Sequence, residues 1–170
     1  MIPVGGVGCE IGVWRGAFSE LLLERARPTA LHLVDPWTFD ADLPRAWYGG
    51  ASAKSQADMD AIARDVRVRF DAQIADGIVI VHRGTSIDAA DAFTAGQLDW
   101  VYIDGDHRYE AVRDELTRYG GLVRTGGVIA GDDYGDGGWW EGGVKRAVDE
   151  WCAARARTPT IIGSQFIVNL

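Results

Sequence analysis

The segment from Leu98 to Tyr134 constrains the fold of this chain more than any other. Two short apolar runs, Trp100–Ile103 and Gly127–Ala130, are each followed directly by acidic residues. Between the runs, apolar and aromatic residues recur at helical spacing with charged residues in the gaps: Tyr109, Val112, Leu116 and Tyr119. This pattern predicts a strand, a helix and a second strand. Such a unit is right-handed, so its two strands run parallel and end at the same edge of one sheet.

Acidic residues stand where each of these two strands ends. Asp104 and Asp106 follow the first strand, and the pair Asp132 and Asp133 follows the second. Open α/β sheets bind ligands at this edge, so we expect the carboxylates to meet there in a ligand site. One alternative is that Asp104 or Asp106 caps the helix that begins near His107. Another is that the Asp132–Asp133 pair forms a solvated turn.

The rest of the chain alternates strand and helix patterns in the same way. Strands are predicted at Val7–Ile11, Ala30–Val34 and Gly77–His82, and the final residues TIIGSQFIVNL predict a hairpin turning at Gly163-Ser164. A first helix is predicted from about Ala17, with Phe18, Leu21 and Leu22 on one face, and a short one after Gly84-Thr85-Ser86. One long helix is predicted from the spacing of Met59, Ile62, Val66, Phe70 and Ile74. A further helix is predicted from the spacing of Val144, Ala147, Val148 and Trp151. We therefore predict one α/β domain over residues 1–170, with a mostly parallel sheet closed by an antiparallel hairpin.

Composition excludes several classes of partner. The net charge of −8 disfavours a nucleic-acid substrate, because phosphate backbones are bound by basic surfaces. No apolar run approaches the roughly 18 residues of a membrane span, and the first residues show no secretory signal. Cys9 and Cys152 suggest neither a disulfide framework nor a metal knuckle, and Cys9 is expected to be a small buried hydrophobe. We expect a cytoplasmic protein.

The segment Pro36–Ser55 shows no clear periodicity but contains four aromatic residues: Trp37, Phe39, Trp47 and Tyr48. One interpretation is a lid or substrate loop that covers a site. The alternative is a loop that packs its aromatic side chains on the core. A second aromatic loop, Gly135–Gly143, carries Trp139 and Trp140 and follows the predicted strand that ends near Asp132.

The loop after the first strand reads Glu10-Ile11-Gly12-Val13-Trp14-Arg15-Gly16. A nicotinamide dinucleotide site needs Gly-x-Gly-x-x-Gly directly after the strand, and no three glycines here have that spacing. The loop instead resembles the first motif of class I S-adenosylmethionine (SAM) methyltransferases, in which an acid and then Gly-x-x-x-Gly cradle the methionine end of the cofactor. The resemblance implies a Rossmann-like, doubly wound, seven-stranded fold and assigns Glu10, Gly12 and Gly16 to the cofactor.

Further features resemble the same family in the same order. Asp35 matches its ribose-binding acid, Ser86 lies in the segment that matches the one near the adenine, and the terminal hairpin matches its reversed last strand. The Leu98–Tyr134 segment resembles the metal-dependent small-molecule O-methyltransferases, including the catechol type and the macrolide-sugar and cephalosporin-tailoring group. That resemblance implies that Asp104, Asp132 and Asp133 hold a divalent metal, and Asp104 also borders the cofactor.

The chemistry of these residues fits that assignment. Carboxylate oxygens form a hard site suited to Mg²⁺, Mn²⁺ or Ca²⁺. A metal held there lowers the pKa of an acceptor hydroxyl, and a nearby base removes its proton. His107 lies three residues after Asp104, where the catechol-type enzymes carry a catalytic lysine, and an imidazole is a suitable base. The alternative is a surface histidine or one that only supports the site.

The resemblance implies a function and leaves alternatives. We expect methyl transfer from SAM to a hydroxyl of a small molecule, assisted by a divalent metal. A metal-independent methyltransferase, a SAM-binding or interaction module without turnover, and, more distantly, a nicotinamide oxidoreductase are the alternatives. Family members carry helices ahead of the first strand, whereas the first strand here begins within a few residues of Met1. Either Pro36–Ser55 replaces that cover, or a second subunit of a homo-oligomer does, or the site is unusually open.

Overall fold

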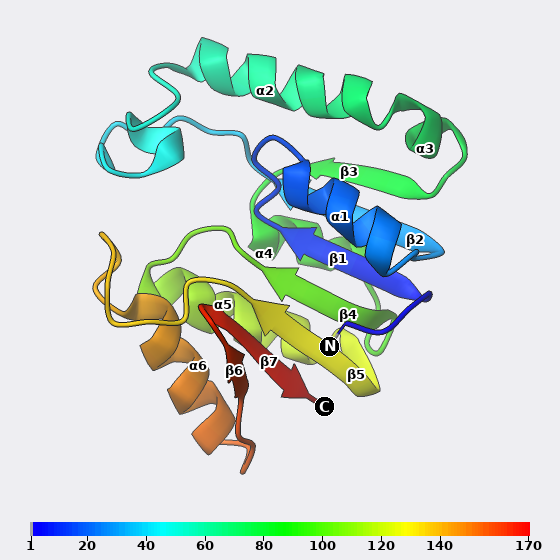
Figure 1. Cartoon of the computed structure of the whole chain (residues 1–170), viewed down its shortest axis with the longest axis vertical. Helices are drawn as coiled ribbons and strands as arrows, with labels where there is room; N and C mark the ends of the chain where they lie inside the picture. The colour runs from blue at the N-terminus through cyan, green and yellow to red at the C-terminus, as the bar shows by residue number, and fades with distance from the viewer. Residues whose placement is uncertain (1) are drawn as a thin grey trace.

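A computed structural model describes residues 2–170 and confirms the predicted α/β sheet (Figure 1). The seven strands lie in the order β3-β2-β1-β4-β5-β7-β6. The first five run parallel, and β7 pairs antiparallel with both β5 and β6. Their bounds are β1 Val7–Ile11, β2 Ala30–Asp35, β3 Val79–Arg83, β4 Leu98–Ile103, β5 Val123–Gly131, β6 Thr160–Ile162 and β7 Gln165–Asn169. Gly163 turns the C-terminal hairpin with a φ of 63°.

Helices cover both faces of the sheet, which makes the fold doubly wound and Rossmann-like. On one face lie α1 (Ala17–Arg25) and α2 (Gln56–Arg69), followed by the short α3 (Asp71–Ala75). On the other lie α4 (Ser86–Ala89), α5 (Tyr109–Gly120) and α6 (Gly143–Ala153), with the 3₁₀ turn η2 (Ala90–Ala92) after α4. No helix in residues 2–170 is both long and apolar enough to cross a membrane.

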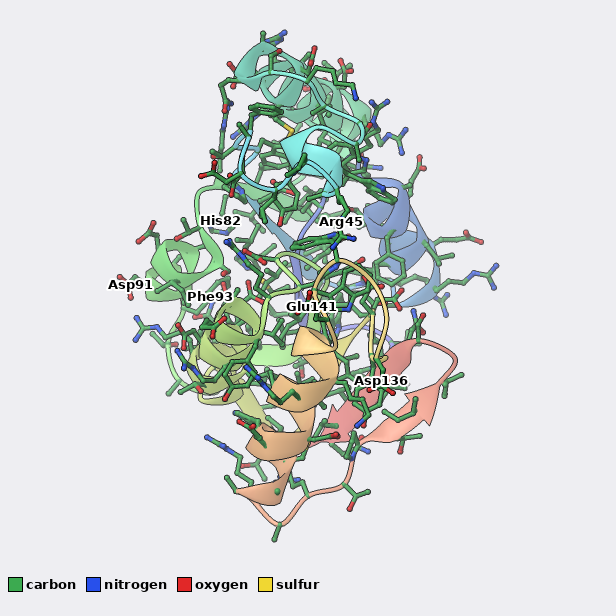
Figure 2. The ribbon with its side chains drawn as sticks, turned by 90° about the vertical axis from the view of Figure 1, so that its left-hand side faces the viewer. Arg45, His82, Asp91, Phe93, Asp136 and Glu141 are labelled. Atoms are coloured by element: carbon green, nitrogen blue, oxygen red, sulfur yellow. The ribbon has the colours of Figure 1, made fainter. Side chains whose placement is uncertain are left out.

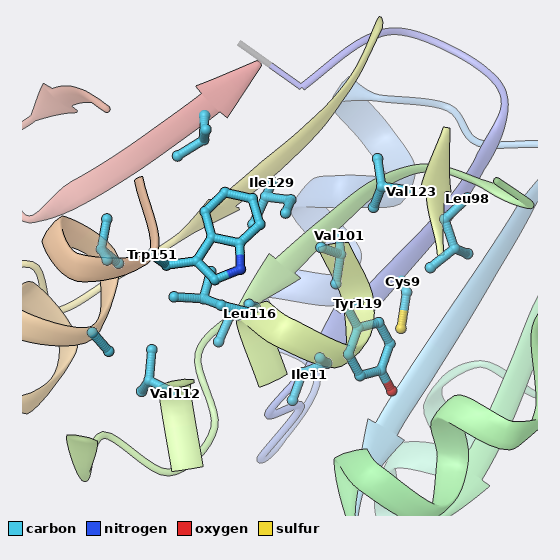
Figure 3. Close-up of a cluster of buried hydrophobic side chains, with 14 of the residues drawn as sticks. Cys9, Ile11, Leu98, Val101, Val112, Leu116, Tyr119, Val123, Ile129 and Trp151 are labelled. Carbon is cyan, nitrogen blue, oxygen red and sulfur yellow. The ribbon is translucent and has the colours of Figure 1, made fainter. Parts of the chain in front are cut away.

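Two apolar clusters, one on each face, fix the sheet between its helices. Alternation along a strand sends neighbouring residues to opposite clusters. Cys9 and Ile11 of β1 pack with α4, α5 and α6, as the close-up in Figure 3 shows. Trp100 and Tyr102 of β4 pack instead with α1 and α2. Cys9 and Cys152 are both buried free thiols, so Cys9 is the small buried hydrophobe that the sequence predicts.

Three details of the helices differ from the sequence prediction. The predicted long helix divides at Phe70, whose backbone leaves helical geometry and whose ring lies against Gly16. Leu21 is 43% exposed instead of facing the core, because α1 turns Ser19 inward to bond the buried Glu10. The helix predicted near His107 begins at Tyr109.

Two loops overhang the edge at which the parallel strands end. The loop after β2 contains the 3₁₀ turn η1 (Trp47–Gly49), and the loop after β5 carries the two tryptophans that precede α6. Figure 1 shows both at the arrowhead ends of the strands, and Figure 2 views that edge directly with Arg45 and Glu141 marking the two loops.

Candidate active site

One large cavity lies at this edge and has a volume of about 880 Å³. It reaches from the loop after β1, past the ends of β2, β3, β4 and β5, to the two overhanging loops. Of the predicted site residues it is lined by Glu10, Gly12, Asp35, Ser86, Asp104, His107, Asp132 and Asp133. Gly16 is absent from its wall. A cavity of this size accommodates a ligand of several hundred daltons.

Glu10 is a buried carboxyl group in the cavity wall. It is 1% exposed and accepts a hydrogen bond from the hydroxyl of Ser19, which is fully buried on α1. Burial raises the pKa of Glu10 to about 8, against the lowering effect of Ser19, and the carboxylates of Asp104 and Asp35 raise it further. With this pKa, Glu10 favours the protonated form at neutral pH.

Asp35 organises the loop that follows β1. One carboxylate oxygen accepts the backbone N–H groups of Val13 and Trp14 at 3.0 and 2.9 Å, and the other accepts that of Trp37 at 2.7 Å. Burial raises the pKa of Asp35, while these three amides lower it. The predicted ribose-binding acid thus already fastens two loops together, and it still faces the cavity.

The two glycines of the first motif have structural roles that the sequence does not reveal. Gly12 has a φ of 87°, and a Cβ there would lie 2.1 Å from the carbonyl oxygen of Asp104. Gly16 has a φ of 76° and precedes α1, and a Cβ there would lie 2.8 Å from the ring of Phe70. Both positions need the left-handed backbone and the absence of a side chain. Gly16 is thus required by Phe70, not by contact with the cavity.

Ser86 begins α4 at the opposite end of the cavity from the β5 loop residues. Thr85 caps that helix, since its side chain accepts the N–H of Asp88. The hydroxyl of Ser86 does not cap the helix and instead donates a hydrogen bond to Glu115 of α5 at 2.7 Å. Glu115 is 3% exposed, although it is one of the charged residues that separate Val112, Leu116 and Tyr119 in the sequence.

Asp104, His107 and Asp133 form one compact cluster. The Nδ1 atom of His107 lies 3.1 Å from an oxygen of Asp133, and its Nε2 atom lies 3.5 Å from an oxygen of Asp104. Each residue offers one donor atom, and the three atoms lie within 4.8 Å of one another. The predicted crossover therefore does bring the ends of β4 and β5 together.

The cluster contains two carboxyl groups, with Asp132 nearby, and a single imidazole. Burial raises the pKa of Asp104, and the neighbouring Asp132 and Asp133 raise it further, against the effect of His107. Burial alone would lower the pKa of His107, but the carboxylates of Asp104 and Asp133 outweigh it and raise that pKa. Neither ring nitrogen of His107 makes a hydrogen bond of good geometry, although both are buried.

These donors fit a divalent cation. The two ring nitrogens of His107 are buried without a well-aligned hydrogen bond, whereas buried polar groups normally have partners, and two carboxylates lie beside them. Carboxylate oxygen suits Mg²⁺, Ca²⁺ and Mn²⁺, and imidazole nitrogen suits transition metals such as iron and zinc. A mixed set of this kind therefore widens the choice beyond the oxygen-only site that the sequence predicts.

Asp106 and Asp132, the other two acids at the strand ends, lie outside the compact cluster. Asp132 accepts hydrogen bonds from Ser164 at 2.6 Å and from the N–H of Asp133 at 2.8 Å. Asp133 has a φ of 60°, so these bonds hold a left-handed backbone that is unfavourable for a residue with a side chain. Asp106 bonds the backbone and guanidinium of Arg108. Neither Asp104 nor Asp106 caps α5 as the alternative supposed, because α5 has no side-chain cap.

Aromatic side chains from both overhanging loops surround His107. Trp139 stacks on its ring with centroids 6.0 Å apart, and Trp140 meets it edge-on at 4.9 Å. Tyr48, from the other loop, contacts Trp139 at 6.4 Å. Trp37 of the same loop is fully buried, and Trp47 is 64% exposed. The aromatic residues thus divide between the two interpretations of Pro36–Ser55: Trp37 and Phe39 pack on the core, Trp47 lines the cavity, and Tyr48 does both.

Sequence reasoning missed two polar residues of the site, Ser19 and Glu115. Both lie at core positions of amphipathic helices: Ser19 is three residues before Leu22, and Glu115 three after Val112. A polar residue on an apolar stripe is the signal that could have found them.

Comparisons with known proteins agree with this geometry. A family described as "Methyltransferase domain" matches residues 9–134. The structure of an rRNA methylase candidate from Clostridium thermocellum is 13% identical, with a TM-score of 0.66 over 99% of this chain and 91% of that one. None of the curated proteins matches the sequence.

Two O-methyltransferase structures are also similar. NovP is 23% identical, with a TM-score of 0.61 over 99% of this chain and 72% of that one. An O-methyltransferase from Bacillus cereus, solved with S-adenosylhomocysteine (SAH), is 18% identical, with a TM-score of 0.64 over 96% of this chain and 74% of that one. At these identities the similarity shows the fold.

Proposed function

The chain belongs to the methyltransferase-domain family, as a class I SAM-dependent methyltransferase that resembles the small-molecule O-methyltransferases, and from this premise we propose what it methylates and how. The proposed reaction transfers the methyl group of SAM to a hydroxyl of a small molecule, with a divalent cation bound beside the acceptor. The observation that carries the proposal is the convergence of Glu10, Asp35, Asp104, His107 and Asp133 on one cavity.

The cavity wall favours a cationic cofactor. Acidic residues greatly outnumber basic ones in this wall. The basic residues are Arg15, Arg45 and Arg108, with His107 beside them. The acidic residues are Glu10, Asp35, Asp40, Asp104, Asp106, Asp114, Glu115, Asp132 and Asp133. SAM carries a sulfonium and an ammonium group, and opposite charges favour the ionised form of a nearby carboxylate. We assign Glu10 to the methionine end, Asp35 to the ribose and Ser86 to the adenine end, with Gly12 shaping the cradle, Gly16 supporting it and Asp104 beside the cofactor.

We assign the cation to Asp104 and Asp133. These two carboxylates face one another across His107 and come from neighbouring parallel strands. When bound, Mg²⁺ or another hard divalent cation would supply a Lewis acid that lowers the pKa of an acceptor hydroxyl. Asp132, the predicted third ligand, supports this pair through the backbone of Asp133 and completes the acidic edge.

We assign proton removal to His107. Its ring lies between the two carboxylates that face the cation site, and they raise its pKa while they carry full negative charge. Neutralisation of that charge would remove the stabilisation of the imidazolium and lower the pKa of His107 again, which would favour a ring that accepts a proton. Trp139 and Trp140 hold the ring in place and exclude water from it.

The aromatic walls indicate the form of the acceptor. Tyr48, Trp139 and Trp140 enclose the His107 end of the cavity, and flat hydroxylated molecules match such walls. The hydroxyl of Tyr48 and the indole N–H of Trp140 are buried without a hydrogen-bond partner. Both can donate to oxygen atoms of an acceptor.

A screen of vicinal-diol compounds with SAM tests the reaction. We expect SAH to form only when an acceptor is present, and a chelator to suppress its formation. Binding of SAH without methyl transfer to any acceptor in such a screen would favour the module without turnover instead.

Variants separate the two roles assigned to the cluster. Asp133→Asn should abolish the heat of Mn²⁺ or Mg²⁺ binding in isothermal titration. His107→Ala should leave that heat nearly unchanged while it lowers methyl transfer by roughly 10²- to 10⁴-fold, as the loss of a general base does. Loss of metal binding in His107→Ala would show that the histidine is a ligand instead of the base. Tyr134→Phe is a matched control, because its hydroxyl bonds Asp149 away from the cluster.

A further inference from the structure

Glu115 is the one deeply buried acid of the cavity wall that the proposed reaction does not use. Among residues 2–170, the buried polar or charged side chains are Glu10, Ser19, Asp35 and Glu115. Glu10 and Ser19 bond each other, and Asp35 binds three backbone amides. Glu115 bonds Ser86 through Oε1, while its Oε2 is buried without any partner.

The position of Glu115 places its carboxyl group beneath the end of β4. A Cβ on Gly105 would lie 3.4 Å from the side chain of Ile11 and 3.7 Å from Oε1 of Glu115. Small or apolar residues, Ile87, Gly105 and Ala111, line the cavity beside it. Ser86 and Glu115 thus lie beside an apolar part of the wall, with the polar residues Thr85 and Asp114 also in the lining. A flat heterocyclic base has the matching shape and polarity.

We infer that the carboxyl group of Glu115, oriented by Ser86, hydrogen-bonds a ring nitrogen of the adenine base of SAM. This inference rests on the proposed function, because it presumes that SAM occupies the cavity. Torsion about the last bond of a glutamate side chain is soft, so a partial rotation can turn the unpartnered Oε2 toward the base. The unpartnered oxygen then gains the partner that a buried polar group requires.

The protonation state of Glu115 fits a donor to the base. Burial raises its pKa to about 8, and Asp106 and Asp114 raise it further, against the lowering effect of Ser86 and His107. A neutral carboxyl group has one O–H to donate. Because Ser86 donates to Oε1, the proton lies on Oε2, and the ring nitrogens N1, N3 and N7 of adenine are acceptors.

A purely structural role for Glu115 is the competing explanation, and Tyr119 provides its control. Tyr119 follows one turn later on α5, and its hydroxyl donates to the backbone carbonyl of Ser86 at 2.8 Å. Helix α5 thus holds Ser86 by two hydrogen bonds. Tyr119 is fully buried in the apolar cluster, as Figure 3 shows, and does not line the cavity. If Glu115 only joins α4 to α5, removal of the Glu115 bond or of the Tyr119 bond should change cofactor binding in the same way.

Titration calorimetry with SAH and three single-position analogues tests the inference. The analogues are S-tubercidinylhomocysteine, which lacks N7, S-(3-deazaadenosyl)homocysteine, which lacks N3, and S-inosylhomocysteine, whose N1 carries a hydrogen. We expect the wild-type protein to bind one of them about tenfold more weakly than SAH, the effect of one hydrogen bond. Glu115→Leu should bind SAH about tenfold more weakly and show no further loss with that analogue.

Two further variants complete the test. Glu115→Gln keeps an N–H donor and should retain the wild-type preference, and Tyr119→Phe should retain it as well. An analogue profile in Glu115→Leu equal to that of the wild type, or no loss for any analogue in the wild type, would overturn the inference while SAH binding stands. Failure of the wild type to bind SAH would instead remove the proposed function itself.

Discussion

Glu10 is the residue at which burial and charge conflict most. Its pKa is about 8 in the folded protein, against an ordinary value of 4.5, because it lies buried beside other carboxylates. Between pH 4.5 and 8 the folded state therefore holds one proton more than the unfolded state at this position. Stability conferred by the neutral carboxyl is complete below pH 4.5 and declines as the pH rises toward 8.

Replacement of Glu10 by glutamine should remove that pH dependence. The amide cannot ionise, so the contribution of one titrating proton is lost. The slope of unfolding free energy against pH should therefore become less negative by about 1.4 kcal/mol per pH unit. Denaturant unfolding of both proteins across this pH range measures the difference. Glu115 titrates in the same direction and remains in the variant, so some slope persists. Parallel curves for the two proteins would mean that Glu10 is ionised in the folded state.

The individual partners of the site residues were the hardest to predict. Adjacency of Asp104 and Asp133 follows from the handedness of one crossover, which the periodicity of the sequence predicts. The partner of Asp132 does not, because Ser164 reaches it only through the pairing of β7 with β5. Glu115 was expected among the charged residues of α5, because helical spacing identifies a face but not how far that face extends into the core.

At the scale of elements, the start of α1 depends on the backbone of Gly16. Alanine there must adopt a φ near 76° and place a Cβ 2.8 Å from the Phe70 ring. We expect Gly16→Ala to lower the free energy of unfolding by about 1–3 kcal/mol. Gly84→Ala is a matched control beside the cavity, because no atom lies within 4 Å of its Cβ and its φ is not left-handed. That variant should stay within about 0.5 kcal/mol of the wild type. Equal stability of both variants would show that the loop can adjust around Gly16.

The loop after β2 offers a direct test of the lid prediction. It is fastened at Trp37 by Asp35 and Gln56, whereas Arg45 is exposed and lines the cavity. If the loop closes over a bound cofactor, SAH should slow tryptic cleavage after Arg45 severalfold. Cleavage after Arg157, near the C-terminal hairpin, should slow much less. Equal protection at both sites would indicate overall stabilisation without closure of a lid.

The whole molecule follows from a few rules of chain topology. The strand and helix order, the parallel register and the terminal hairpin were all predictable, because each depends on periodicity, turn residues and crossover handedness. The ends of some strands and helices differ from the prediction, because packing determines them. The strand β5 runs to nine residues instead of the predicted four, and Phe70 divides the helix that periodicity joined.

The assembled first loop also bears on the choice between SAM and a nicotinamide dinucleotide. A dinucleotide places its pyrophosphate on free backbone N–H groups at the start of the first helix. Here the carboxylate of Asp35 already accepts the amides of Val13 and Trp14, and Gly16 bonds Val13 beneath Phe70. A pyrophosphate would meet a negative charge where it needs donors. The architecture of the loop therefore disfavours a nicotinamide dinucleotide, as the glycine spacing does.

Thermal unfolding with SAH and with NAD⁺ tests this conclusion for the whole molecule. SAH at 100 times its dissociation constant should stabilise the folded state by about 2.7 kcal/mol. For a domain of this size that corresponds to a rise in melting temperature of roughly 5–10 °C. NAD⁺ at the same concentration should leave the melting temperature unchanged, because the carboxyl group of Asp35 already bonds the loop amides that a pyrophosphate would need. A rise with NAD⁺ and none with SAH would contradict both the loop argument and the proposed reaction.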